Sequence, residues 1–258
     1  MLVIAFYYYF CQNKKEQVFE ITTYMLHSGG TEKSMSFSGI TGDALRFLFE
    51  NRMNNSKEWY DSHKSDYKKY VYTPFAELIT ELAPAMLEID SQLITLPSKL
   101  ISRVRRDTRF TKDKTLYRDN VWLVFLRDKS LMSTAPCFWF GIDQKGSSYG
   151  IGYYGAEPAS MANMRDMIVN SHPAFLMAQK YYEAQNEFII GGDLYKRSKY
   201  PEQPENLRTW LDRKNIYFEA VQNNFELAFS KELPQVLKKG FKELKPIYDF
   251  LCVVESRI

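Results

Sequence analysis

Apolar and aromatic residues recur at helical spacing in the first regular part of the chain. Thr41 is expected to cap a helix, and the polar run Asn54-Asn55-Ser56 is expected to end it. A second helix is predicted from side chains at near-helical spacing: Trp59, His63, Tyr67 and Tyr70. Thr73-Pro74 opens a third helix, with proline at its tolerated first position. The chain therefore begins its regular structure with helices.

The middle of the chain changes to aromatic and β-branched runs that are typical of strands. Four strands are predicted: Ile101–Phe110, Trp122–Arg127, Cys137–Asp143 and Ser148–Tyr154. The sequence Gln144-Lys145-Gly146-Ser147 indicates a hairpin turn between the last two. Strands that follow one another through short loops favour an antiparallel sheet.

Helical patterns return after this sheet. Amphipathic helices are predicted over Pro158–Val169 and Pro173–Gln185, with a short strand over Glu187–Ile190. Leu207–Phe218 and Leu233–Val254 are predicted to be mostly helical, with Pro246 breaking the last one. We therefore expect an α+β fold with a central antiparallel sheet at about residues 100–155, flanked by N-terminal and C-terminal helices.

The first 36 residues do not fit this organisation. Residues 1–11 are almost wholly apolar, but they are too short to span a bilayer and lack the basic start of a secretory signal. The segment that follows is polar, and Met25 and Met35 are both candidate start sites. We therefore interpret residues 1–36 as an N-terminal extension or a mis-assigned start, and residues 37–258 as a single domain.

Composition limits the classes of protein to which this chain can belong. Apolar residues make up 45% of its 258 residues, which excludes disorder of the whole chain. The net charge of +3 is lower than that of strong nucleic-acid binders. The spacing of the three cysteines is not that of a metal site. Their odd number and wide separation favour a reducing, cytoplasmic location. No membrane span is expected.

The densest charge lies between Arg103 and Asp119. This block holds seven cations and three carboxylates in 17 residues. Strand alternation would place Arg103, Arg105, Asp107 and Arg109 on one face. The face is either a solvated surface of Arg–Asp pairs, worth little energy, or a clamp for phosphate or carboxylate. Because like charges at neighbouring same-face positions repel, we favour an anion site made of Arg103, Arg105, Arg109, Lys112, Lys114 and Arg118.

Other residues of the block are predicted to support that site. Asp107 and Asp113 would orient the cations, Tyr117 would supply a hydroxyl, and Trp59 would stand at the rim. Because a turn separates Asp107, Asp113 and Asp119, no metal site is expected from them. Gly150-x-Gly152-x-x-Gly155 matches a dinucleotide fingerprint, but its setting in an antiparallel sheet argues against a bound cofactor.

Several motifs together resemble a widespread, mainly bacterial family of uncharacterised proteins, domain of unknown function 2461. The resemblance extends from Phe37 to the C-terminus and is carried by Phe37-Ser38-Gly39-Ile40, Asn54-Asn55, Trp59-Tyr60, the block from Arg106 to Arg118, Gly192-Asp193-Leu194 and Pro246. The resemblance implies no established activity. It implies that the charged block is the signature of the family.

Three functions remain open from the sequence. The first is an enzyme acting on a phosphorylated or carboxylated small molecule, with Arg105 and Arg109 gripping the anion and Asp107 acting as orienter or base. The second is a nucleic-acid or nucleotide module whose cations contact phosphates while aromatic rings stack on bases. The third is a structural or partner-binding protein in which the block is an ion-pair network.

Overall fold

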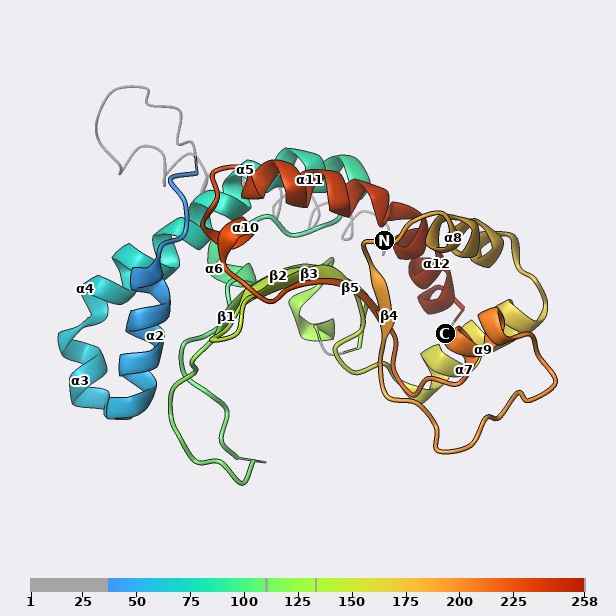
Figure 1. Ribbon diagram of the computed structural model, residues 1–258, viewed down its shortest axis with the longest axis horizontal. Helices are drawn as coiled ribbons and strands as arrows, with labels where there is room; N and C mark the ends of the chain where they lie inside the picture. The colour runs from blue at the N-terminus through green and yellow to red at the C-terminus, as the bar shows by residue number, and fades with distance from the viewer. Residues whose placement is uncertain (1–36, 110, 133, 258) are drawn as a thin grey trace, which may run out of the picture.

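The computed structural model describes residues 37–109, 111–132 and 134–257. The predicted N-terminal extension therefore lies outside the described residues. The chain starts with helices, passes through a charged segment into a five-stranded sheet, and ends with helices that return over that sheet (Figure 1). An α+β fold with a central antiparallel sheet is thus confirmed. Among the described helices, none has the length and apolar content needed to cross a bilayer.

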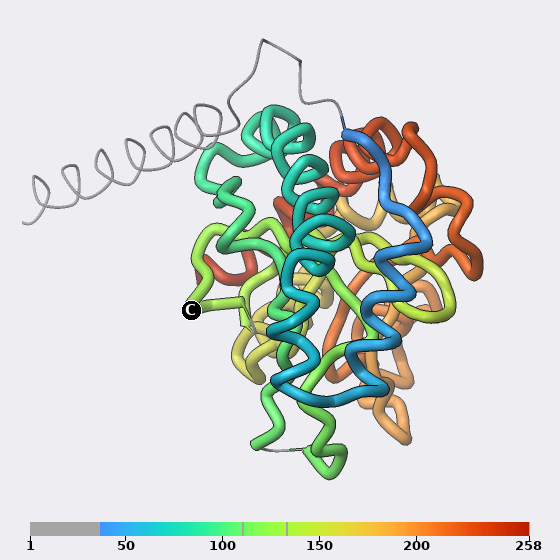
Figure 2. The backbone as a smooth tube through the Cα atoms, turned by 90° about the vertical axis from the view of Figure 1, so that its left-hand side faces the viewer, coloured from blue at the N-terminus to red at the C-terminus, as the bar shows by residue number. Residues whose placement is uncertain are grey.

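The N-terminal helices form a hairpin-like pair. Figure 2 shows the first helix lying alongside the helix that leads into the long one, and the rings of Phe47 and Tyr67 pack between them at 5.8 Å. Asn55 ends the first helix in a left-handed conformation with φ of 48°, which asparagine tolerates well. The elements are α2 (Gly42–Asn54), α3 (Lys57–Ser62), α4 (Lys64–Asp66), the π-helix η1 (Tyr67–Tyr72), α5 (Thr73–Ile89) and α6 (Pro97–Leu100).

The sheet is antiparallel throughout, with the strand order β1-β2-β3-β5-β4. Its strands are β1 (Val121–Phe125), β2 (Cys137–Ile142), β3 (Ser147–Gly152), β4 (Ile189–Gly191) and β5 (Tyr217–Gln222). The predicted β2–β3 turn is confirmed, since the Asp143 amide donates to the Gly146 carbonyl at 3.0 Å. A 3-10 turn, η2 (Lys129–Leu131), lies between β1 and β2.

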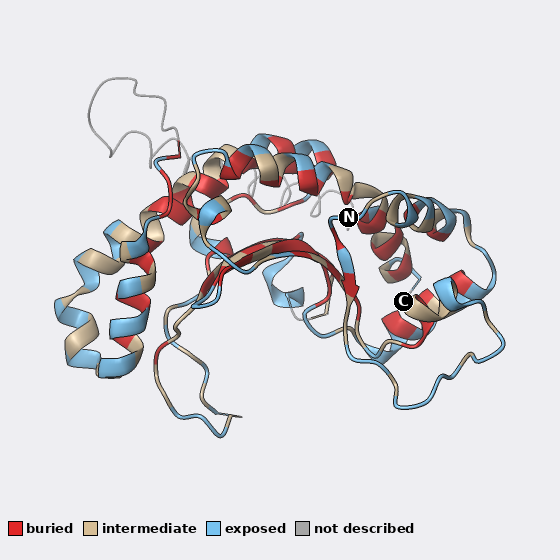
Figure 3. Cartoon of the chain, viewed as in Figure 1, coloured by how far each residue is buried: buried red, intermediate tan, exposed pale blue. Residues whose placement is uncertain are grey.

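The C-terminal helices pack on the core face of the sheet and beyond its β4 end (Figure 1). They are α7 (Pro158–Val169), α8 (Pro173–Glu183), α9 (Glu205–Leu211), α10 (Glu226–Phe229), α11 (Leu233–Glu243) and α12 (Lys245–Glu255). Phe138 of β2 contacts Phe241 of α11 at 5.3 Å, and Phe140 contacts Phe75 of α5 at 6.0 Å. Figure 3 shows buried residues concentrated in the sheet and in the helices that cover it. Pro246 lies in the first turn of α12, so the predicted break before the last helix is confirmed.

Among the described residues, no helix layer of this kind covers the other face of the sheet, and we call it the open face. Because side chains alternate along strands, residues between the core positions point to it. Strand register brings them together in rows, with Trp122 beside Gly141, Ser148 and Val221 in one row. The next row contains Trp139, Gly150, Glu219 and Ile189.

Two predicted elements differ from the structure. The predicted strand Ile101–Phe110 forms only isolated bridges, at Ile101 and Arg105, so the sheet begins at residue 121 rather than near residue 100. The predicted helix Leu207–Phe218 is wrong over its second half. Its first half belongs to α9, whereas Tyr217–Gln222 is β5, which pairs along the whole of β3 and extends the sheet to residue 222.

Candidate anion-binding site

The charged block forms a two-stranded projection next to β1, which we call the charged arm (residues 102–109 and 111–120). Its two segments are joined by two backbone hydrogen bonds. The Arg106 amide donates to the Leu116 carbonyl at 2.8 Å, and the Arg118 amide donates to the Val104 carbonyl at 3.0 Å. In Figure 1, α5 and α11 lie on one side of the sheet and the arm extends toward the other side. The arm therefore lies on the side of the open face.

The predicted alternation along the first segment is confirmed. The four residues expected on one face are exposed: Arg103, Arg105, Asp107 and Arg109. The residues between them, Val104, Arg106 and Thr108, are partly buried. The arm thus presents arginines to solvent on one side and uses the other side to attach itself to the domain.

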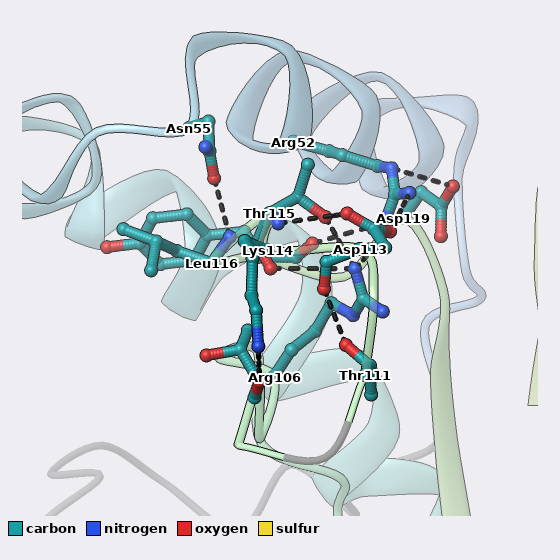
Figure 4. Close-up of polar contacts among 11 residues, drawn as sticks. Arg52, Asn55, Arg106, Thr111, Asp113, Lys114, Thr115, Leu116 and Asp119 are labelled. Atoms are coloured by element: carbon teal, nitrogen blue, oxygen red, sulfur yellow. Dashed lines mark hydrogen bonds and ion pairs between the residues drawn. The ribbon is translucent and has the colours of Figure 1, made fainter.

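Asp113 is the main anchor of the arm (Figure 4). Its carboxylate pairs with Arg106 of the arm and accepts from Arg52 of α2 at 3.0 Å. It also accepts from the Thr115 amide at 2.9 Å and from the Thr115 hydroxyl at 2.8 Å. Arg52 further reaches Asp119 at 3.3 Å. Asp113 and Asp119 therefore orient cations, and Arg52 is a partner that the sequence analysis did not identify.

A second attachment joins the arm to the turn after α2. The Asn55 side-chain oxygen accepts from the Leu116 amide at 2.6 Å (Figure 4). Nearby, Tyr117 is only 3% exposed and stacks on Tyr60 at 5.3 Å. Burial raises the pKa of the Tyr117 hydroxyl. The stacked and buried ring is a packing contact for the arm.

Trp59 lies in the aromatic cluster at this attachment. Its ring stacks on His63 at 4.0 Å and contacts Phe47 at 5.8 Å. The His63 ring nitrogen Nδ1 lies 2.8 Å from the Trp59 carbonyl. Trp59 therefore holds α2 against α3, and its expected position at a ligand rim remains a prediction.

Two of the predicted anion-binding cations make contacts within the arm. Arg109 forms a bidentate pair with Asp107, at 3.0 Å from Nε and 2.7 Å from Nη2, and both side chains are exposed. Hydrogen bonds from the Arg109 side chain and amide lower the pKa of Asp107 to about 2, which makes it a weak base. Lys114 donates to the Thr108 carbonyl at 2.8 Å across the turn.

The other four cations have no carboxylate partner within the part of the chain that the structure describes. Arg103, Arg105 and Lys112 are exposed. Arg118 is half-buried, and its guanidinium lies over the Trp122 ring at 4.5 Å. Its Nε atom is buried and has no hydrogen-bond partner among the described residues. Burial, followed by repulsion from Arg106, lowers the pKa of Arg118.

A groove lies on the open face, and Trp122, over which Arg118 lies, is one of its lining residues. Its volume is about 390 Å³, within the range of small-molecule sites. Lining residues include Trp122, Trp139, Ser148 and Glu219. Trp139 and Glu219 were not predicted as site residues from the sequence, and Glu219 lies on β5, the strand that was predicted as a helix. The alternation of Phe138, Trp139 and Phe140 was the available signal for Trp139.

The aspartates of the arm do not gather into a metal site. Asp107 pairs with Arg109, while Asp113 and Asp119 pair with Arg52. Within the described residues, no group of three or more histidine, cysteine, aspartate or glutamate side chains is placed to hold a metal ion. The near-dinucleotide motif also lies in β3, between antiparallel neighbours, and not before a helix of a parallel unit.

The anchoring of the arm is expected to weaken in acid. Hydrogen bonds from Thr115 and Arg106 hold the pKa of Asp113 well below its usual value. A carboxylate with a lowered folded-state pKa stabilises the fold above its unfolded pKa of about 4, and this contribution disappears as the pH falls toward the folded value. We expect the difference in urea midpoint between the wild type and Asp113→Asn to shrink between about pH 5 and pH 2.5.

Asp61→Asn is the matched control, because Asp61 is exposed and makes no described hydrogen bond. Its midpoint should follow that of the wild type at every pH. An Asp113→Asn variant that differs from the wild type by the same amount at pH 5 and at pH 2.5 would contradict the anchoring role.

Comparison with known proteins gives one match. A family model described as "Conserved hypothetical protein (DUF2461)" matches residues 43–250, which include the charged arm, the whole sheet and most of the helices. No curated protein matches the sequence.

Proposed function

The chain belongs to the DUF2461 family of conserved hypothetical proteins, and we propose that it binds a small phosphorylated or carboxylated molecule between the charged arm and the open face. The observation that carries this proposal is Arg118. A half-buried guanidinium stacked on Trp122, with a buried Nε atom that has no acceptor among the described residues, is costly to keep unless an anion compensates it.

The arrangement of the remaining cations supports a ligand more than a purely structural network. The ion pairs that attach the arm use Arg52, Arg106 and two aspartates. Arg103, Arg105 and Lys112 take no part in them and stay exposed. Guanidinium groups bind phosphate and carboxylate through paired N–H donors, so this surplus matches a small anion.

A reaction on the bound molecule would draw on Glu219. Its carboxyl lies in the groove, and burial raises its pKa, which suits proton transfer better than the strongly acidic Asp107 does. We propose that any catalysis takes place on the molecule bound at this same site and is not a separate function. We also propose a cytoplasmic location, which the free thiols of Cys137 and Cys252 support.

The test is a thermal-shift screen against inorganic phosphate, sugar phosphates, nucleotides, dicarboxylates and short oligonucleotides at two salt concentrations. Ligand binding raises the melting temperature by mass action. We expect one class of small anion to raise it at both salt concentrations. Arg118→Met should reduce the shift several-fold, because it removes the guanidinium that lies over Trp122.

Lys180→Ala is the matched control, since Lys180 is exposed on α8, away from the arm. A shift produced by oligonucleotides alone and lost at high salt would instead identify a nucleic-acid module. The absence of a shift with every compound would support the structural or partner-binding role.

A further inference from the structure

The groove on the open face has a floor made of two small residues. Gly141 of β2 and Ser148 of β3 are directly paired, and both are partly exposed. Trp122 of β1 stands at one end of this row and Val221 of β5 at the other. The backbones of these two end residues are three strand spacings, about 14 Å, apart. The small residues between them therefore leave an accessible hollow over the middle strands.

The neighbouring rows form the two sides of this groove. Trp139 and Glu219 lie on one side. The Trp139 ring meets Tyr217 edge-to-face at 6.1 Å across β3, and Gly150 between them is buried, so this row has no gap. The ends of the strands form the other side, with three polar residues: Asn120, Asp143 and Asn223. A ligand in the groove would thus have indoles and a carboxyl on one side and polar groups on the other.

Most of these polar side chains have hydrogen-bonding capacity that the described part of the chain does not use. Ser148, Glu219 and the two asparagines, Asn120 and Asn223, make no side-chain hydrogen bond to a described residue. Burial raises the pKa of Glu219, as expected for a carboxyl without a donor. Two amides, a hydroxyl and a carboxyl offer donors and acceptors together. A ligand whose groups both donate and accept would satisfy this set.

The charges around the groove favour a neutral ligand. Two backbone amides of the β2–β3 turn donate to the Asp143 carboxylate, at 2.7 Å and 3.1 Å, and compensate its charge. Lys145 lines the groove and the Arg118 guanidinium lies over the Trp122 ring, so a cation at this indole would meet two positive groups. An anion at the groove floor would instead meet the carboxyl of Glu219.

We propose that the groove binds the pyranose ring of a neutral sugar. Each sugar hydroxyl donates one hydrogen bond and accepts others, which matches the mixed set of amides, hydroxyl and carboxyl. The C–H faces of a pyranose ring are apolar and pack on the indole surfaces of Trp122 and Trp139 that line the groove. This inference goes beyond the proposed anion site, because the contacts that carry it include no cation of the charged arm.

The experiment is an NMR titration of the isotope-labelled full chain with methyl glucoside, methyl galactoside, N-acetylglucosamine, sorbitol and choline. The chain has four tryptophans, so its indole N–H signals report separately on the groove and on the distant Trp59 and Trp210. We expect one of the three sugars to shift the signals of Trp122 and Trp139 until they saturate, and to leave the other two signals in place. Replacing each tryptophan by phenylalanine assigns the signals.

Sorbitol has the hydroxyls of a sugar but no rigid ring, so it should bind several-fold more weakly. Glu219→Gln should weaken binding of the sugar about fivefold to tenfold, because it removes a charged acceptor. Ser148→Val fills the floor with a side chain that strands favour and should weaken binding more than tenfold, or about that. Glu202→Gln is the matched control, because Glu202 is exposed before α9 and makes no described contact. Circular dichroism and melting temperature check that each variant is folded.

Other outcomes would overturn the inference. Shifts of the groove signals by choline and by none of the sugars would identify a cation site. Equal shifts by sorbitol and the sugars, or sugar binding that Ser148→Val leaves unchanged, would show that the groove holds no sugar ring. Arg118→Met should leave sugar affinity unchanged, and loss of sugar binding in this variant would place the sugar at the anion site instead. Sugar binding in a protein that gives no thermal shift with any anion would support the groove and count against the proposed function.

Discussion

Arg118→Met is expected to weaken binding of the anionic ligand about 10- to 100-fold. Methionine retains an apolar chain over Trp122 but removes the guanidinium that lies there at 4.5 Å. A hydrogen bond to a charged group contributes about 1.5–3 kcal/mol, which corresponds to about 10- to 100-fold in affinity. Titration of the ligand found by the thermal-shift screen, measured against wild type and variant, gives the ratio directly.

The same substitution should not lower the stability of the ligand-free protein. Arg118→Met removes a buried donor that has no described partner, so the ligand-free variant should unfold at the same urea concentration as the wild type or at a higher one. Arg197→Met is the control, because Arg197 is exposed and makes no described contact. Unchanged ligand affinity in Arg118→Met would show that the anion does not lie over Trp122.

Gly150→Ala is expected to lower the free energy of unfolding by about 3 kcal/mol or more. A Cβ atom at this position would lie 2.0 Å from the Phe218 carbonyl oxygen and 3.0 Å from the Glu219 Cα atom. Both neighbours are backbone atoms of β5, so the strands themselves would have to separate. Urea denaturation followed by tryptophan fluorescence measures the loss.

A second glycine provides the matched control. Gly42 is the first residue of α2, and a Cβ atom there would meet nothing within 4 Å. Gly42→Ala should be neutral or slightly stabilising, because alanine reduces the freedom of the unfolded chain. If Gly150→Ala had the same urea midpoint as Gly42→Ala, β3 and β5 could not be as close as the structure places them.

Local patterns predicted most of the helices because each carries its own periodic signal. The predicted helix Pro158–Val169 has the bounds of α7, and the predicted turn Gln144-Lys145-Gly146-Ser147 lies where β2 leads into β3, with Ser147 already in the strand. β5 was not predicted, because the position where this strand begins depends on contacts with residues far away in the sequence. Asn215 stands just before it and bonds the Tyr153 carbonyl at 3.0 Å and the Ala156 amide at 2.9 Å, about 60 residues away.

The candidate site was predictable to the extent that it is contiguous in the chain. The charged block and its exposed arginines follow from alternation alone. Arg52 and Asn55 hold the arm from 61 residues away, and nothing in the spacing of α2 indicates that these two side chains face it. Glu219 required knowledge of β5 and of its register with Gly150, which pairing across the sheet determines.

The π-helix η1 determines how the two ends of one long helical stretch face their partners. The helical stretch runs from α4 through η1 (Tyr67–Tyr72) into α5. Each turn of the π-helix contains more residues than a turn of an α-helix. The aromatic side that contacts α2 is thereby rotated relative to the Phe75–Leu82 side that covers the sheet. A one-residue deletion within η1 would shift this angular phase by about 100° and turn one of the two sides away from its partner.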